Sequence, residues 1–483
     1  MPSYFNRSDI NSSEIQNSRR PDRWSSLAPK LKHILHCAVM LGIIGLSIDK
    51  NIRMKNCVLS KFDKLIDDSD PFEAYGTYYT VLLYIPRLLV LLALPLFVFN
   101  FCGLFFFNCF NNQVILKYSP SQAPFICFRV VTKGYYPNLV RKIVLKNLEV
   151  CLQEKLEKFL IEVIAEESIE GLLQHPKVRQ IVVPSDYRTE RSSLFKARVL
   201  QYGLENGTHL LKNDDYIVHL DEETLLSKNS IRGILNFTTD GKHPIGQGLI
   251  TFTNGDVINW ITTLLDTFRV TDDLGKMRFQ FRVFHKPFFG LRGSYMVIKS
   301  KVEHDVSFDH GPDGSVAEDT FFAMIAFKKG YSFDFIEGEM HEKSPFTLTD
   351  LLRQRKRWTQ GAILVAHSLE IPLKNKFLFG MTLYSQLLAP LAGSGVVLST
   401  LYPLLNNRLI GLNVLSAFIG GTVIYALFFG WLKSYDLKDI NMWQFLLGVI
   451  GILCLLPLNF IIGIVHVPQS VFGEKHNFHI VQK

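Results

Sequence analysis

The segment Tyr216-Ile-Val-His-Leu-Asp-Glu-Glu-Thr224 joins a short apolar run to a cluster of acids. Such a run is typical of a buried strand. Similar runs precede it at residues 125–131, 159–165 and 181–183, with helical periodicity between them at 138–153 and 193–202. Strands that alternate with helices predict an α/β domain with right-handed crossovers and a mainly parallel mixed sheet. Ligands of such sheets bind where the strands end, so the acids after residue 220 are candidates for a functional site.

Asp221 and Glu223 are candidate ligands of a divalent metal at that edge. Hard cations such as Mg²⁺ and Mn²⁺ take carboxylates and keep open positions for substrate phosphates. The alternative is a helix N-terminus, because acids there favour the dipole of the helix expected at 225–237. Spacing alone leaves both interpretations open.

Asp319, in the segment Gly314-Ser-Val-Ala-Glu-Asp-Thr320, is a candidate general base. It opens an apolar helix, so helix capping is the alternative. A carboxylate that is held near a reacting centre, beside another acid such as Glu318, could accept a proton from a substrate.

The most specific motif is Leu351-Leu-Arg-Gln-Arg-Lys-Arg-Trp358. Gln354, Arg357 and Trp358 are spaced i, i+3 and i+4, which predicts that they share one face of a helix. A guanidinium matches phosphate oxygens in a bidentate way, and a flat indole suits the face of a sugar. The alternative is a basic interfacial helix, in which Arg353, Arg355 and Lys356 face anionic lipid headgroups.

Composition divides the chain between membrane and water. Its 483 residues would allow about three domains of roughly 150 residues, but 48% are hydrophobic, 12% aromatic and only 20% charged. Mean hydropathy is +0.15, and the charged residues nearly vanish from several long windows. These values exclude a disordered, collagen-like or small disulfide-stapled protein. The seven cysteines are odd in number and form no Cys-x-x-Cys pair, which supports neither disulfides nor a zinc site.

Four charge-free windows are long enough to cross a bilayer as helices: 88–110, 378–405, 409–432 and 442–467. A fifth, 34–48, is shorter, and a buried or interfacial helix is its alternative. The polar N-terminus carries Arg7, Arg19, Arg20 and other cations and is therefore expected in the cytosol. Two spans then return the chain to the cytosol at about residue 112, so the soluble domain is expected there too. The glycosylation acceptors at Asn206 and Asn236 should therefore stay unmodified.

The net charge of +8 and the pI of about 8.9 suit a protein that faces a membrane or handles phosphate groups. No nucleic-acid-binding motif is present. A membrane transporter or receptor would need ionisable residues within its spans, and the C-terminal windows contain only His466. A non-enzymatic transporter or receptor is thus disfavoured but kept as an alternative.

The acid pair, the later Glu-Asp and the Gln-x-x-Arg-Trp motif, in this order, resemble the inverting glycosyltransferases of family 2. That resemblance implies a GT-A type nucleotide-sugar-binding domain flanked by transmembrane helices. The sequence departs by carrying Asp-Glu-Glu where many relatives have Asp-x-Asp, so the longer side chain of Glu223 would take the place of the second aspartate. Longer runs narrow the resemblance to the egghead-type β-1,4-mannosyltransferases: 217–226, 240–250, 335–358, Phe195-Lys-Ala-Arg198 and the ending Val481-Gln-Lys483.

The resemblance implies transfer of mannose from GDP-mannose to glucosylceramide in glycosphingolipid biosynthesis. A processive β-glycan synthase of the same superfamily is the other enzymatic alternative. The implied site has Asp319 as general base and Asp221 and Glu223 as ligands of Mn²⁺ or Mg²⁺. In this implied site the donor diphosphate is bound by Lys196, Gln354 and Arg357. The nucleoside is bound by Thr132 and Glu166, and the acceptor by Trp358 and Glu318.

The implied organisation is a multi-pass protein of the Golgi or endoplasmic reticulum bilayer. Its parts are a polar cytosolic N-terminus (1–32), an N-terminal membrane region (33–116), a GT-A catalytic domain (117–350), an interfacial helix region (351–376), a C-terminal membrane region with three spans (377–467) and a tail (468–483).

Overall fold

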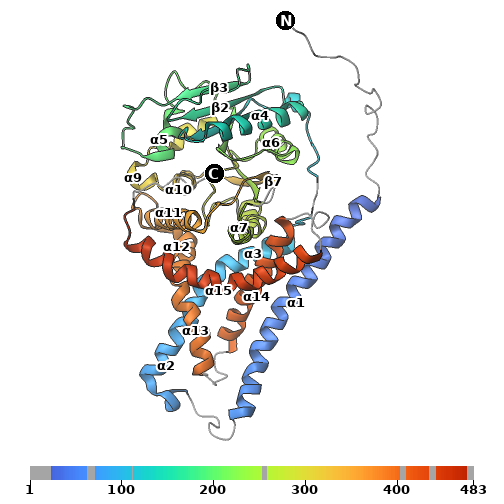
Figure 1. Cartoon of the computed structure of the whole chain (residues 1–483), viewed down its shortest axis with the longest axis vertical. Helices are drawn as coiled ribbons and strands as arrows, with labels where there is room; N and C mark the ends of the chain where they lie inside the picture. The colour runs from blue at the N-terminus through green and yellow to red at the C-terminus, as the bar shows by residue number, and fades with distance from the viewer. Residues whose placement is uncertain are drawn as a thin grey trace.

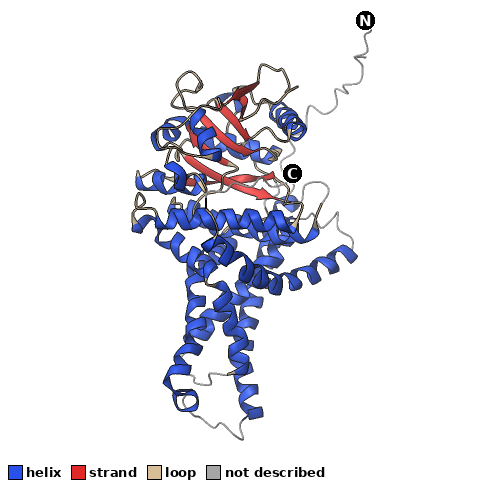
Figure 2. Ribbon diagram, turned by 60° about the vertical axis from the view of Figure 1, so that its left-hand side comes forward, coloured by secondary structure: helices blue, strands red, loops and turns tan. Residues whose placement is uncertain are grey.

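A computed structural model describes residues 23–62, 71–110, 113–252, 258–402, 410–434 and 442–475. An α/β domain sits on a stalk of long helices, and further helices lie between the two (Figures 1 and 2). Arg7, Arg19, Arg20 and the segment 476–483 lie outside the described residues.

The α/β domain contains a seven-stranded mixed sheet in the order β3-β2-β1-β4-β6-β5-β7. Its strands are β1 (Ile126–Thr132), β2 (Phe159–Ala165), β3 (Val178–Val182), β4 (Tyr216–Asp221), β5 (Ile245–Thr251), β6 (Met296–Lys299) and β7 (Phe333–His341). Only β6 runs antiparallel to its neighbours β4 and β5, whereas the other pairs are parallel. The predicted α/β class and mainly parallel mixed sheet are therefore confirmed.

The sheet register brings the polar ends of the strands to one edge. Val131 of β1 pairs with Asp221 of β4, and Thr251 of β5 pairs with His341 of β7. Because the carboxyl ends of parallel strands share an edge, the residues that follow these four strands form one functional rim.

Helices cover both faces of the sheet (Figure 2). Those of the α/β domain are α4 (Pro137–Gln153), α5 (Phe195–Tyr202), α6 (Lys228–Asp240), α7 (Trp260–Asp272), α8 (Ser300–Val306), α9 (Gly311–Gly314), α10 (Glu318–Lys328) and α11 (Leu348–His367). Two π-helical turns, Asp273–Met277 and Gln280–Phe284, continue the direction of α7. The helix α6 begins later than expected from the sequence, because Ser227 caps it by accepting a hydrogen bond from the Ser230 amide.

The stalk consists of α1 (Arg23–Phe62), α2 (Pro71–Val90), α13 (Ala389–Leu401) and α14 (Ile410–Ser434) (Figure 1). Within it, α1 packs on α14 and α2 packs on α13. Within the described residues, three segments are long and apolar enough to cross a membrane: Ala28–Asp49, Pro71–Phe106 and Ile410–Ser434. A fourth candidate is the bent pair Trp443–Leu455 and Pro457–Phe472, with an angle of 43° at the break. The chain therefore has helices suited to membrane association.

The helices differ in extent from the charge-free windows. The window 88–110 overlaps only the second half of the candidate span Pro71–Phe106. The first half of that span contains Arg87, so it was not part of a charge-free window. The window 378–405 is divided between α12 (Leu373–Leu387) and α13. The window 442–467 falls in α15 (Met442–Phe472), which lies across the head of the stalk beneath the α/β domain (Figure 1). The number of crossings remains a prediction.

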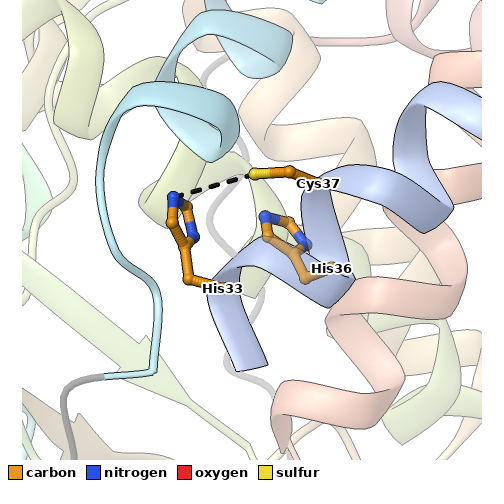
Figure 3. Close-up of side chains that lie close together, drawn as sticks. All are labelled: His33, His36 and Cys37. Atoms are coloured by element: carbon orange, nitrogen blue, oxygen red, sulfur yellow. Dashed lines mark hydrogen bonds between the residues drawn. The ribbon is translucent and has the colours of Figure 1, made fainter. Parts of the chain in front are cut away.

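Three side chains of α1 hold the end of α3 (Leu94–Phe106). His36 Nε2 donates to the Leu104 carbonyl at 3.0 Å, and His33 Nε2 donates to the Phe105 carbonyl at 3.1 Å. Cys37 lies beside His33 on the same helix face (Figure 3). The ligand atoms of these three residues are close enough to hold a metal, but the two Nε2 atoms serve carbonyls that a helix end leaves unpaired. The group therefore acts as a cap that joins α1 to α3.

Candidate active site

Three carboxylates meet where β4 and β7 end. Asp221, Glu223 and Glu342 each offer an oxygen, and these oxygens lie within 4.8 Å of one another. Glu342 is anchored on both sides, because its amide donates to the Thr251 carbonyl at 2.9 Å and its Oε1 accepts from Thr224 Oγ1 at 2.8 Å. The sequence motif did not reveal Glu342. Its only signal was its position directly after a strand.

These carboxylates fit a divalent cation. They are hard oxygen donors of the kind that Mg²⁺ and Mn²⁺ take, on two segments tied by backbone hydrogen bonds between Leu225 and His341. The helix-dipole alternative does not hold, because the fully described first turn of α6 contains no acid. Asp221 and Glu223 precede its cap, Ser227, and lie in the turn after β4.

Lys196 of α5 connects the carboxylate cluster with the start of α10. Its Nζ lies 2.6 Å from Asp221 Oδ1 and 3.6 Å from Glu318 Oε1. It also donates to the Gly293 carbonyl at 3.2 Å. Burial by itself would lower the pKa of Lys196, but Asp221 and Glu318 raise it above its ordinary value. This side chain is therefore a firmly held cation at the rim.

Asp319 faces the same space. A Cβ atom at Gly293 would lie 3.2 Å from Asp319 Oδ2 and 3.3 Å from Lys196 Nζ, so the glycine leaves room where the two groups converge. Asp319 Oδ1 accepts a hydrogen bond from the Thr320 amide at 2.6 Å. Burial, and then the charge of Glu318, raise the pKa of Asp319 to about 7. A carboxyl group with this pKa is suited to accept a proton at neutral pH.

Thr132 and Glu166 lie at the ends of β1 and β2, and both have partners within the protein. The Thr132 hydroxyl donates to Glu222, the middle acid of the turn after β4, which is buried. Glu166 Oε1 accepts from Arg198 Nη2 at 2.7 Å. The two residues are neighbours, because the Glu166 amide donates to the Thr132 carbonyl at 3.2 Å. Their contact with a nucleoside stays a prediction.

The Gln-x-x-Arg-Trp motif lies on α11, next to the start of α10. A side chain at Gly361 would meet the Cβ atom of Ala317, so this glycine lets α11 approach the residue that precedes Glu318. Gln354 Oε1 is buried and has no hydrogen-bond partner among the described residues. The Trp358 side chain remains 37% exposed. The helix that carries the motif thus packs against the start of α10, the helix of the general-base candidate.

Arg355 does not face a lipid surface. Its Nη2 donates to the Leu265 carbonyl of α7 at 3.3 Å, and its Nη1 donates to Asn459 Oδ1 of α15 at 3.4 Å. The interfacial-helix alternative therefore fails for this residue, because α11 is enclosed between α7 and α15. Arg353 does stay exposed, with 53% of its side-chain surface accessible.

Two arginines near the carboxylate cluster carried no recognisable motif. Arg269 of α7 lies 4.8 Å from the ring centre of Trp358. Arg292 pairs with Asp273 at 2.5 Å and donates to the Arg269 carbonyl at 3.3 Å. Glu342 acts electrostatically on both guanidinium groups. In the sequence neither arginine belongs to one of the motifs that predicted the site.

Comparisons with known proteins identify the class. The model of "Glycosyl transferase family group 2" matches residues 216–433, which include the carboxylate rim, Asp319 and α11. Among solved structures, the mannosyltransferase PcManGT from Pyrobaculum calidifontis, in complex with GDP-Man and Mn²⁺, is 14% identical. It covers 72% of this chain and 99% of its own, with a TM-score of 0.45. The fold, the rim and the family model together define a glycosyltransferase of family 2.

Relatives of higher sequence identity show which kind of glycosyltransferase this chain is. The chain is 50% identical over 460 residues to beta-1,4-mannosyltransferase egh of Drosophila melanogaster, across 94% of this chain and 97% of the relative. It is 46% identical over 459 residues to beta-1,4-mannosyltransferase bre-3 of Caenorhabditis elegans, across 94% and 98%. The chain belongs to this egghead and bre-3 family of β-1,4-mannosyltransferases. The non-enzymatic alternative is thereby excluded.

Proposed function

We propose that this enzyme transfers mannose from GDP-mannose to glucosylceramide with a β-1,4 linkage, as a step of glycosphingolipid biosynthesis. The observation that carries the mechanism is the half-buried carboxyl of Asp319, with a pKa of about 7, beside Lys196 and the carboxylate rim. Family membership supports mannose as the sugar and the β-1,4 linkage.

The donor binds along the rim. Asp221, Glu223 and Glu342 hold Mn²⁺ or Mg²⁺, which when bound neutralises charge on the nucleotide diphosphate. Lys196, Gln354 and Arg357 bind the diphosphate oxygens with preorganised positive or polar groups. The unpartnered Oε1 of Gln354 supports a ligand contact for this side chain. Thr132 and Glu166 contact the nucleoside at the ends of β1 and β2.

The acceptor binds between α10 and α11. Trp358 stacks on its sugar and Glu318 holds a hydroxyl group. Asp319 takes the proton from the attacking hydroxyl of the acceptor. In the same step the oxygen of that hydroxyl bonds to the anomeric carbon of the α-linked mannose, on the face opposite to the diphosphate. The bond from that carbon to the diphosphate breaks in the same step, so the linkage formed is β and free nucleoside diphosphate leaves.

The lipid acceptor reaches the site from a bilayer around the stalk. We place the catalytic domain (117–350) and the interfacial region (351–376) on the cytosolic face of the Golgi or endoplasmic reticulum, between the membrane regions 33–116 and 377–467. Asn206 is exposed, whereas the Asn236 amide is engaged by the backbone of Lys117 and Ile115. Asn206 is therefore the informative acceptor. Glycan on Asn206 in cells would place the domain in the lumen.

The direct test uses the full chain in lipid nanodiscs. Each reaction contains a panel of ceramide glycolipids and one labelled donor: GDP-mannose, UDP-glucose or UDP-N-acetylglucosamine. The products are identified by mass spectrometry. We expect addition of one hexose to glucosylceramide from GDP-mannose alone, and release of that hexose by a β-mannosidase. Products of many added sugars would instead indicate a processive synthase, and transfer from a uridine nucleotide would overturn the proposed donor.

A further inference from the structure

The guanidinium group of Arg269 packs against two aromatic rings. Its central carbon is 4.5 Å from the ring centre of Phe252 and 4.8 Å from that of Trp358. Two cation–π contacts hold the position of the group and leave its N–H donors available for other partners.

The in-plane donors of Arg269 are poorly matched by the protein. Its nearest ion-pair partner is Asp266, at 3.9 Å from Nη1, and its buried Nε has no hydrogen-bond partner in the part of the chain that the structure describes. Burial, and then the neighbouring Arg292, lower the pKa of Arg269. Arg292 differs, because Asp273 pairs with it at 2.5 Å. A buried cation without a close anion is costly unless a ligand supplies one.

Arg269 stands beside the rim that holds the donor. Phe252 follows Thr251, whose carbonyl accepts from the Glu342 amide at 2.9 Å. Trp358 follows Arg357, the residue assigned to the diphosphate. Arg269 therefore lies close enough to Glu342, the third carboxylate of the rim, to feel its charge, and it contacts Trp358, the proposed platform for the acceptor sugar.

We propose that Arg269 binds the β-phosphate of the donor nucleotide. This inference rests on the proposed function, since that function supplies the diphosphate. The β-phosphate is the one that carries the transferred sugar, so it is the phosphate nearest to the acceptor platform on which Arg269 is stacked. A guanidinium matches phosphate oxygens with paired N–H donors, and here two rings hold it in place before the ligand arrives.

The test compares nucleotide binding by the full-length protein in nanodiscs with Mn²⁺ present, measured by calorimetry with GDP and GMP. The wild type is expected to prefer GDP. In Arg269→Gln, affinity for GDP is expected to fall about tenfold or more, as loss of a charge-assisted contact implies, while affinity for GMP stays within about twofold. Arg269→Lys keeps the charge but loses the fork, and is expected to fall between the two.

Arg232→Gln is the matched control, because it removes the same guanidinium group at a site on α6, where Arg232 is paired with Glu154 at 2.7 Å and does not contact Phe252 or Trp358. It should leave both affinities unchanged. Equal losses for GDP and GMP in Arg269→Gln would show a purely structural residue and overturn the inference. Affinities for GDP and GMP that both stayed at the wild-type values in Arg269→Gln would also overturn it, while the proposed function stands. A wild type that prefers UDP over UMP and ignores GDP would overturn only the donor, and the same ratio read with uridine nucleotides would still decide the role of Arg269.

Discussion

The candidate site has two walls that are built differently. The acidic wall (Asp221, Glu223, Glu342 and Asp319) stands on strand ends and on the start of α10. The cationic wall (Arg269, Arg292 and Trp358) stands on α7, α11 and the segment before β6. Sheet register positions most of the acidic wall, because backbone hydrogen bonds join the turn after β4 to the end of β7. The cationic wall has no such ladder.

Helices of the membrane region position the cationic wall instead. Thr271 of α7 donates to the Ala426 carbonyl of α14 at 2.6 Å. Asn100 of α3 donates to Asp272 Oδ1 and accepts from the Lys276 amide, both at 2.9 Å. One wall is therefore a property of the α/β domain alone, whereas the other depends on how the stalk docks. Loss of Asp319 from the acidic wall should therefore impair the chemical step, whereas disturbance of the cationic wall should lower donor affinity while the metal site stays intact.

The largest expected effect is that of Asp319→Asn on the acidic wall. The amide cannot accept the acceptor proton, so turnover should fall about 10²–10⁴-fold. Binding of GDP, measured by calorimetry, should remain within about twofold because the cationic wall is intact. If this variant kept most of its turnover while folded, Asp319 would not be the base.

Glu342→Gln tests the third carboxylate of the rim. Loss of one anionic ligand should weaken Mn²⁺ binding by at least about 10–100-fold, the cost typical of disturbing a ligand's surroundings. Manganese titration followed by electron paramagnetic resonance reads this directly. Glu339→Gln is the control on the same strand, since Glu339 pairs with Asn229 and is not in the cluster. Equal Mn²⁺ affinity in both variants would remove Glu342 from the proposed metal site.

The pH profile tests Asp319 without a mutation. Only its carboxylate form accepts a proton, and its pKa is raised to about 7. Turnover divided by KM should therefore be constant above about pH 7 and fall about tenfold for each unit below it. GDP affinity measured at the same pH values is the control. A profile that stayed flat down to about pH 5, near the pKa of an ordinary carboxyl group, would contradict the raised pKa.

The two walls also differ in what the sequence reveals. The acids after β4 could be predicted, because an apolar run marks a strand and parallel strands end at one edge. Glu342 could not, since its role depends on β7 pairing with β5 far along the chain. Arg269 could not either, because only contact with Phe252 and Trp358 distinguishes it from an ordinary helix cation.

The membrane helices show the same limit. Windows free of charge found the apolar segments, but apolarity does not specify direction. The window 442–467 predicted a span, and in the structure this segment is a candidate span bent by 43° that lies across the head of the stalk (Figure 1). The end of α15 is held there by α11, since Gln360 Nε2 donates to the carbonyls of Gly473 and Glu474 at 3.2 and 3.0 Å. Such contacts depend on tertiary packing, which no local pattern encodes.

The smallest expected effect is that of Asn100→Leu, which tests whether the cationic wall is supported independently of the acidic wall. Asn100→Leu removes two hydrogen bonds of α3, one to Asp272 at the end of α7 and one from the Lys276 amide of the π-helical turn that follows. It leaves the Lys276 amide and Asp272 short of a partner, at a cost of about 1–3 kcal/mol in stability. Arg269 precedes this turn on the same helix, so GDP affinity should fall a few-fold while Mn²⁺ affinity is unchanged. Cys102→Ala, on the same helix, is the control for a general weakening of α3. If Asn100→Leu weakened Mn²⁺ binding as much as GDP binding, the two walls would not be independently supported, and the stalk would position the whole site.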